Sequence, residues 1–458
     1  GVEVQLLKMY PIKVANNKSV FKTNQPIKIR GKNKNKSGLI LETKHQNVFY
    51  NYFQNDKGNS LSLKNLTLQT RDFLNNIFPN NEADYRFAGV YFSEQFNANA
   101  KPNIDFISVE NCIINGAVGI AAYGSHSMNQ SISDFKTKNK VKTIQIKNNQ
   151  FNYCNAAFGF SNMGYEKVEV TGNKVYNFSS SFISFPASGI DETYFPPLFE
   201  NRKQVTFTNN EFKNDHVIQI PSGRAMTPFV IKGGNGKLIF KNNEVTNLLS
   251  DSRDGQVNTF YYKTTELGKA EFHGNTFYNV IGRGSIRYPA SLIKQRGVNT
   301  LILEGNTFEI TKAALAKIGV IKSEQSSLRN IKGKDFLCEF LQEGTFSTLT
   351  KKYTIRNNTF KMPFLNKSSE VFDIANFIFE NNTFEIGYFG QSKIKATVTE
   401  DNVLFLGRHR IDRQQGKSPL QFISRNNKIK INGSESSMIH FIKYTTGIQN
   451  GHAKLKDE

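Results

Sequence analysis

Four lysines are the residues of this chain whose type and spacing could do chemistry. Each ends a short apolar stretch that we expect to be a β-strand, namely residues 229–232, 260–263, 292–294 and 320–322. Lys232, Lys263 and Lys294 follow one another at steps of 31 residues, and Lys322 lies a further 28 residues on. In a protein built from repeated coils, equivalent positions stack about 4.8 Å apart. Crowded ammonium groups repel one another, which favours the neutral form and lets a lysine act as a base near neutral pH. The spacing therefore predicts a row of lysines that removes protons or binds an anion.

Arginines and tyrosines accompany these lysines. The predicted catalytic residues are Lys294, Lys263, Lys232, Arg287 and Arg296. The predicted substrate-binding residues are Lys322, Arg283, Tyr262 and Tyr288, with the two tyrosines as acids or as stacking partners. The alternative is that the lysines point outward at strand ends and pair with nearby carboxylates, which stabilises a protein little. Such carboxylates are Asp251, Asp254, Glu266 and Glu324.

A repeated four-residue phrase predicts the elements that position these side chains. It consists of Asn or Gly, then Asn, any residue and an apolar residue, and copies begin at residues 148, 172, 209, 242, 274, 305, 357 and 381. A chain with one closed core has no need to repeat such a phrase, whereas each coil of a solenoid solves the same turn and core problem. The phrase therefore predicts a solenoid.

The residues around the phrase indicate strands rather than helices. Alternating β-branched and aromatic segments such as 168–170 and 301–303 precede the copies, and period-two patterning is typical of β-strands. Asn and Gly tolerate the left-handed backbone region, so they supply the turn, and the apolar residue re-enters the core. Stacked Asn amides can hydrogen-bond from coil to coil, as in side-chain ladders. We expect an all-β fold of the β-solenoid type.

The repeat also suggests how the chain is organised. We expect an N-terminal cap over residues 1–60 and the solenoid over 61–435. An insertion at about 312–350, with a short helix at 313–317, interrupts the solenoid, and residues 436–458 form the C-terminal end. The chain opens almost directly in a strand, so we expect a signal peptide to be absent or already removed. No apolar stretch is long enough to cross a bilayer, which argues against membrane insertion.

The charge of the chain favours a polyanionic partner. The chain has 59 Lys and Arg residues and 38 Asp and Glu residues, which gives a formal net charge of +21. Such an excess of positive charge attracts acidic polymers. AT-rich coding would enrich Lys and Asn in the same way, without a partner. Nucleic acid is disfavoured because the chain has no recognition module and its aromatic residues follow the core pattern. Three cysteines, Cys112, Cys154 and Cys338, have no metal-ligand spacing and suit packing.

The phrases over residues 105–430 resemble right-handed parallel β-helix proteins of the pectate-lyase-like class, which includes polysaccharide lyases, some glycoside hydrolases and phage tailspikes. Residues 291–294 through 304–308 are similar to the segment that holds the base lysine in alginate lyases and chondroitinase B. Residues 407–410 (Gly-Arg-His-Arg) depart from that family's Arg-His-Gly turn, because the Gly is on the other side.

The resemblance implies a right-handed parallel β-helix that cleaves a uronate-containing glycan by β-elimination. Lys294, Lys263 or Lys232 would be the base, and Arg287 or Arg296 would bind the sugar carboxylate. Calcium or an arginine cluster would neutralise that carboxylate, although no sequence pattern identifies a metal site. The expected partner is an anionic polysaccharide, met outside the cell or at a cell or virion surface.

Two other functions stay open on this sequence. A non-catalytic adhesin or tailspike module would display loops to a glycan and could be a monomer or a homotrimer. A glycoside hydrolase would need two carboxylates at a defined separation. The available pairs are Asp251 with Asp254 and Asp191 with Glu192.

Overall fold

The chain is all-β, with long parallel sheets that are compatible with a β-solenoid. The computed structural model describes residues 1–13, 19–23, 26–41, 47–51, 59–70, 88–93, 103–116, 118–123, 140–154, 156–161, 164–178, 183–184, 202–219, 230–232, 237–251, 261–283, 290–332, 336–344, 351–367, 369–372, 374–389, 404–407, 421–435 and 442–444. These residues belong to two compact units. Unit 1 is Gly1–Lys213 with Val230–Ile239, and unit 2 is Asn214–Phe229 with Phe240–Glu458.

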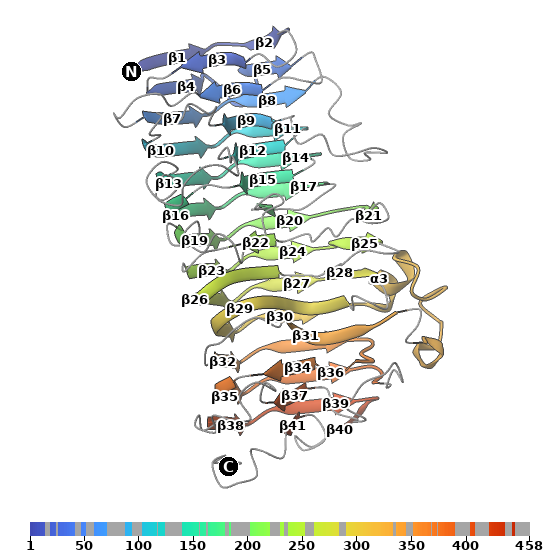
Figure 1. Ribbon diagram of the computed structural model, residues 1–458. Helices are drawn as coiled ribbons and strands as arrows, with labels where there is room; N and C mark the ends of the chain where they lie inside the picture. The colour runs from blue at the N-terminus through green and yellow to red at the C-terminus, as the bar shows by residue number, and fades with distance from the viewer. Residues whose placement is uncertain are drawn as a thin grey trace, which may run out of the picture. The chain divides into compact units, whose positions relative to one another are not determined.

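Unit 1 contains three parallel sheets, and the chain visits them in turn (Figure 1). The first sheet contains β1 (Val2–Leu6), β4 (Ile27–Gly31), β7 (Asn59–Lys64), β10 (Asn103–Glu110), β13 (Lys140–Lys147), β16 (Gly164–Thr171) and β19 (Arg202–Thr208). The second contains β2 (Met9–Ile12), β5 (Gly38–Leu41), β8 (Thr67–Thr70), β11 (Ile113–Asn115), β14 (Gln150–Asn152), β17 (Lys174–Tyr176) and β20 (Glu211–Lys213). The third contains β3 (Ser19–Thr23), β6 (Asn47–Asn51), β9 (Ala88–Ser93), β12 (Val118–Tyr123), β15 (Ala156–Ser161) and β18 (Ile183–Ser184). Two further strands are β22 (Val230–Lys232) and β23 (Lys237–Lys241), which spans the division between the units.

Unit 2 repeats this arrangement. Its first sheet contains β26 (Tyr261–His273), β29 (Ala290–Glu304), β32 (Lys351–Arg356), β35 (Ile374–Glu380) and β38 (Gln421–Arg425), and β31 (Cys338–Gly344) also pairs with β29. Its second contains β24 (Glu244–Thr246), β27 (Thr276–Tyr278), β30 (Thr307–Glu309), β33 (Thr359–Met362), β36 (Thr383–Ile386), β39 (Lys428–Ile431) and the antiparallel β40 (Ser434–Glu435). Unit 2 also contains two small parallel sheets. One consists of β21 (Val217–Gln219), β25 (Leu249–Asp251) and β28 (Ile281–Arg283), and the other of β34 (Ser369–Phe372), β37 (Leu404–Gly407) and β41 (Ile442–Tyr444).

Residues 1–51 contribute β1 to β6, which are the first described strands of the three sheets of unit 1. The division into a cap at residues 1–60, a solenoid at 61–435 and an end at 436–458 stays a prediction.

The repeated phrase forms the turn between the first and second sheets. Its first residue has a positive φ in each unit, for example 55° at Asn148 and 66° at Gly305, as predicted from the tolerance of Asn and Gly for this region. Its last residue enters the core, and in unit 2 the rings of Phe277, Phe308 and Phe360 stack with centroids 4.6 and 5.0 Å apart. The phrase therefore supplies both the turn and the core of each coil.

The second Asn of the phrase forms a buried ladder in each unit. The amide Nδ2 of Asn149 donates to Asn173 Oδ1 at 3.0 Å in unit 1, and Asn275 donates to Asn306 Oδ1 at 2.8 Å in unit 2. Asn306 Nδ2 also donates to the carbonyl oxygen of Phe272, and its Oδ1 accepts from the backbone N–H of Asn275. Each amide thus satisfies polar groups in two neighbouring coils, which confirms the predicted coil-to-coil hydrogen bonds and lets the turn lie in the interior.

The predicted short helix is confirmed as α3 (Lys312–Lys317), which begins the insertion of unit 2 and is followed by the 3-10 helix η2 (Leu328–Asn330). The Thr311 side chain caps α3 by accepting a hydrogen bond from the N–H of Ala314. Thr311 Oγ1 donates in turn to Asn279 Oδ1 at 3.0 Å, and Asn279 Nδ2 donates to Asn247 Oδ1 at 3.2 Å. The helix is therefore attached to a second asparagine ladder of the same unit.

The prediction that residues 320–322 form a fourth strand ending in lysine is wrong. The N–H of Gly319 donates to the carbonyl of Ala316, and the N–H of Val320 donates to that of Leu315. With a φ of 72° at Gly319, these bonds make a Schellman motif that ends α3. Lys322 follows this motif and is an exposed residue of a bend. The turn at the end of α3 therefore prevents the strand that the apolar residues Val320 and Ile321 had suggested.

Candidate functional site

Lys263 and Lys294 of the predicted lysine row do not occupy equivalent positions in the paired strands β26 and β29. Lys263 of β26 lies opposite Arg296 of β29, and Lys294 lies opposite Tyr261, so the two lysines are offset by two residues. The pairing of β26 with β29 shifts on both sides of Gly268, because β-bulges add residues to one strand and not to the other. An equal spacing of 31 residues therefore does not give an equal place in the sheet.

The other predicted residues fall in different parts of the chain. Lys232 ends β22 in unit 1, whereas Lys263 and Lys294 belong to unit 2. Tyr262 lies opposite Gln295 in the same strand pair. Several predicted residues lie outside the described residues: Arg287, Tyr288, Asp254, Asp191, Glu192 and the motif residues Arg408, His409 and Arg410. Their roles, and those of the lysines and of Arg296, stay predictions.

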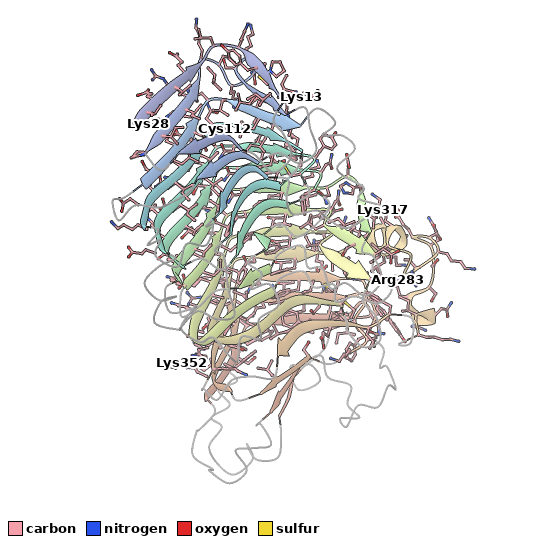
Figure 2. The ribbon with its side chains drawn as sticks, turned by 45° about the horizontal axis from the view of Figure 1, so that its top comes forward. Lys13, Lys28, Cys112, Arg283, Lys317 and Lys352 are labelled. Carbon is pink, nitrogen blue, oxygen red and sulfur yellow. The ribbon has the colours of Figure 1, made fainter. Side chains whose placement is uncertain are left out.

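Two predicted substrate-binding residues do belong to neighbouring elements of unit 2. Arg283 ends β28, and its Nη1 lies 3.4 Å from where a Cβ on Gly319 would be, so the guanidinium lies against the end of α3. Lys322 follows Gly319 by three residues. Figure 2 shows Arg283 and Lys317 on the same side of unit 2, and Lys352 away from them. The fold thus joins the end of β28 to the segment that carries Lys322.

The segment that follows Thr311 is rich in exposed cations. We call residues 312–332 the basic insertion; it carries one acidic residue, Glu324, and five cations, Lys312, Lys317, Lys322, Arg329 and Lys332, all of them exposed. Within the part of the chain that the structure describes, none of these cations and no atom of Arg283 forms an ion pair. Unpaired charges of one sign at a surface raise the local concentration of an oppositely charged ligand. The basic insertion can therefore bind anionic groups.

A carboxylate, that of Asp251, belongs to the strand next to Arg283. Asp251 ends β25 and lies opposite Arg283 in the parallel pair β25–β28. Asp251 Oδ1 is buried and has no hydrogen-bond partner among the residues that the structure describes, and such an acceptor is costly to bury alone. Asp251, Arg283, Lys317 and Lys322 together make the candidate site of unit 2, with cations to bind an acidic group and a carboxylate to accept a proton or a hydroxyl hydrogen bond.

Sequence reasoning missed the rest of the basic insertion. It singled out Lys322 and passed over Lys312, Lys317, Arg329 and Lys332. The available signal was composition, since five cations and one acid fall within 21 residues.

The three cysteines are buried and belong to the core, as predicted. Burial raises the pKa of Cys112 to about 12 and that of Cys154 to about 12, because desolvation disfavours the thiolate. Burial likewise raises the pKa of Cys338. Buried thiols in this state are poor nucleophiles, so none of the three is part of the candidate site.

The described residues offer no cluster of three or more His, Cys, Asp or Glu side chains able to hold a metal ion. We therefore assign no residues to the calcium that the resemblance implies and derive no step through it. A search of the described helices for a span long and apolar enough to cross a membrane finds none. No protein-family model, no curated protein and no solved structure matches the chain.

Proposed function

We propose that this protein binds an acidic polysaccharide through the basic insertion and Arg283. The observation that carries the proposal is the concentration of unpaired charge: five cations within 21 residues, together with Arg283, form no ion pair within the described residues, whereas Lys269, Arg356 and Arg425 of the same unit are paired with carboxylates. Carboxylate or sulfate groups along a glycan would neutralise cations that the protein itself leaves uncompensated. Such a partner occurs outside cells, so we also propose that the protein acts in the extracellular space or at a cell or virion surface.

The fold and the resemblance extend this proposal to a reaction. We propose that each unit is part of a right-handed parallel β-helix and that the protein cleaves its glycan by β-elimination. A base takes the proton α to the sugar carboxylate, the bond to the glycosidic oxygen breaks as the double bond forms, and an acid protonates the leaving oxygen. Arg283 would neutralise the sugar carboxylate, while Asp251 joins Lys263 and Lys294 as a candidate base.

Binding is tested with heparin, alginate and polygalacturonate at low and high salt. The triple variant Arg283→Gln, Lys317→Gln, Lys322→Gln should bind at least tenfold more weakly than the unaltered protein, because three charges are lost from one surface. The matched control is Lys352→Gln, Lys428→Gln, Lys430→Gln, which removes three exposed lysines of unit 2 outside the candidate site. An equal loss of affinity in both variants would show that binding depends only on net charge and would contradict the proposed site.

Cleavage is tested by the ultraviolet absorbance of unsaturated uronates, with and without calcium. On a substrate that gives this signal, we expect Lys294→Ala, Lys263→Ala or Asp251→Asn to lower turnover while leaving the thermal unfolding temperature within a few degrees. Binding without any absorbance change, together with a trimeric mass, would favour the adhesin or tailspike alternative. Reducing ends released without the absorbance change would favour a glycoside hydrolase.

A further inference from the structure

The N-terminal coils of unit 1 carry a second concentration of positive charge. Residues 1–41 include nine Lys and Arg residues and a single acid, Glu3. Glu3 Oε1 already pairs with Arg30 Nε at 3.4 Å. The remaining described cations of this end therefore have no carboxylate of their own to neutralise them, and Figure 2 shows Lys13 and Lys28 at this end of unit 1.

Four of these cations come from two turns that lie side by side. The N–H of Lys32 donates to the carbonyl of Leu6 at 2.8 Å, and the N–H of Gly38 donates to the carbonyl of Lys8 at 3.2 Å. The turn after β1 thus lies against the turn after β4, at the passage from the first sheet to the second. We call the four cations of these turns, Lys8, Lys32, Lys34 and Lys36, the lysine corner.

The second turn of the lysine corner is held by its own hydrogen bonds. The carbonyl of Asn33 accepts from the N–H groups of Lys36 and Ser37 at 3.0 and 2.8 Å. Asn33 Oδ1 accepts from the N–H of Asn35, and Ser37 Oγ accepts from the N–H of Asn33. The hydroxyl of Thr67 in the next coil donates to the carbonyl of Lys34. The backbone that carries these lysines is therefore fixed before a ligand arrives, which lowers the entropic cost of binding.

Two of the four ammonium groups are also positioned. Lys34 Nζ donates to Asn111 Oδ1 at 2.8 Å, and Lys8 Nζ lies 5.6 Å from the ring centroid of Tyr10, within the range of a cation–π interaction. Lys32 and Lys36 are exposed, and neither forms an ion pair within the described residues. The corner therefore presents four cations, two of them oriented by neutral partners that leave the charge uncompensated.

We propose that the lysine corner is a second binding site for the carboxylate or sulfate groups of an acidic saccharide, separate from the site of unit 2. The ligand class rests on the proposed function; the site itself rests on the geometry of unit 1. A saccharide fits better than a nucleic acid because Tyr10 is half-buried and faces Lys8. The described corner thus has no free aromatic ring on which a base could stack.

The test is calorimetric titration of the full chain with a heparin hexasaccharide. We expect two sites per chain in the unaltered protein. The variant Lys32→Ala, Lys36→Ala should lose one site or weaken it at least tenfold, whereas Lys428→Ala, Lys430→Ala, which removes two exposed lysines of β39, should keep both. Circular dichroism and thermal unfolding should be unchanged, because the side chains of Lys32 and Lys36 form no hydrogen bond or ion pair among the residues that the structure describes.

Other results separate this inference from the proposed function. The triple variant of Arg283, Lys317 and Lys322 should also reduce two sites to one. If it keeps both sites while the corner variant loses one, the unit 2 site fails and the lysine corner stands. The inference is overturned if the corner variant keeps both sites. It is also overturned if single-stranded DNA of equal charge displaces the hexasaccharide from the lysine corner at a lower concentration than unlabelled hexasaccharide does.

Discussion

Two regions of unit 2 use polar side chains in opposite ways. In the asparagine ladder, amides such as Asn306 and Asn358 are buried, and each donates to a backbone carbonyl and to the next amide. In the basic insertion, all five cations, Lys317 and Lys322 among them, are exposed, and their charges are unpaired within the described residues. The difference teaches that polar groups which satisfy one another stabilise the fold, whereas polar groups left unsatisfied at a surface are available to a ligand.

The largest effect is expected from removing one amide of the ladder. Asn306→Ala leaves the carbonyl of Phe272 and the amide of Asn275 without their partner. Unsatisfied buried groups are costly, so the free energy of unfolding should fall by about 3 kcal/mol. Urea unfolding measures this change. At temperatures where the variant is folded, its affinity for heparin should stay within twofold of that of the unaltered protein. A large loss of affinity in the fully folded variant would show that the ladder and the basic insertion do not act independently.

The next effect sharpens the role of the turns. Gly274 and Gly305 have φ values of 62° and 66°, and a Cβ on Gly274 would lie 2.7 Å from Asn242 Oδ1, whereas the nearest atom for Gly305 is at 3.9 Å. Gly305→Ala should cost about 1 kcal/mol from the left-handed backbone alone, and Gly274→Ala should cost more. Gly305→Asn should cost less than Gly305→Ala, because Asn tolerates this conformation. Thermal unfolding of the three variants checks this order.

A paired surface charge is an intermediate case. Glu169 of unit 1 is partly buried, which raises its pKa, but hydrogen bonds from Lys167 and Gln145 and the charges of Lys167 and Lys147 outweigh burial and leave the pKa lowered. A carboxyl whose pKa is lowered by folding adds stability above its unfolded pKa and loses it as the pH falls through the folded pKa. Glu169→Gln should therefore destabilise at pH 7, by about 0.5 kcal/mol, because the lysines that pair with Glu169 are exposed to solvent. As the pH falls below about 4.5 and through the lowered folded pKa, the difference should shrink and then vanish, and a difference that stays constant across this range would argue against the ion pairs.

The smallest effect on stability is expected in the basic insertion. Lys317→Gln or Lys322→Gln removes an exposed, unpaired charge, so the free energy of unfolding should change by less than about 0.5 kcal/mol. Glycan binding should weaken severalfold in the same variants. A variant that loses stability in proportion to binding would show that these lysines support the fold. The basic insertion and the asparagine ladder would then not differ in the way proposed.

Much of the fold could be predicted from local patterns. The phrase around Asn306 contains its own turn residue, its ladder amide and its core residue Phe308, so each copy specifies the same local structure. The short helix at residues 313–317 was predicted because its alanines, leucine and lysine favour helix, and the structure adds that Thr311 caps it. These features depend on residues close together in the chain.

The site could be predicted only in part. Arg283 and Lys322 were chosen for their types, but the approach of Arg283 to Gly319 joins β28 to a segment more than thirty residues later, and no spacing encodes it. The offset of Lys263 from Lys294 comes from irregular pairing at Gly268, which is visible only once the strands are paired.

By itself, the sequence determined the coil: which residue turns, which amide is buried and which ring packs, because these choices rest on local backbone preference and hydrophobicity. Only the tertiary structure decided which charges become neighbours, namely Arg283 beside the end of α3, and Lys8 beside the turn of Lys32 to Lys36. Strand register and the packing of an insertion are long-range, since a shift of one or two residues in a pairing costs little locally and yet changes every neighbour across the sheet.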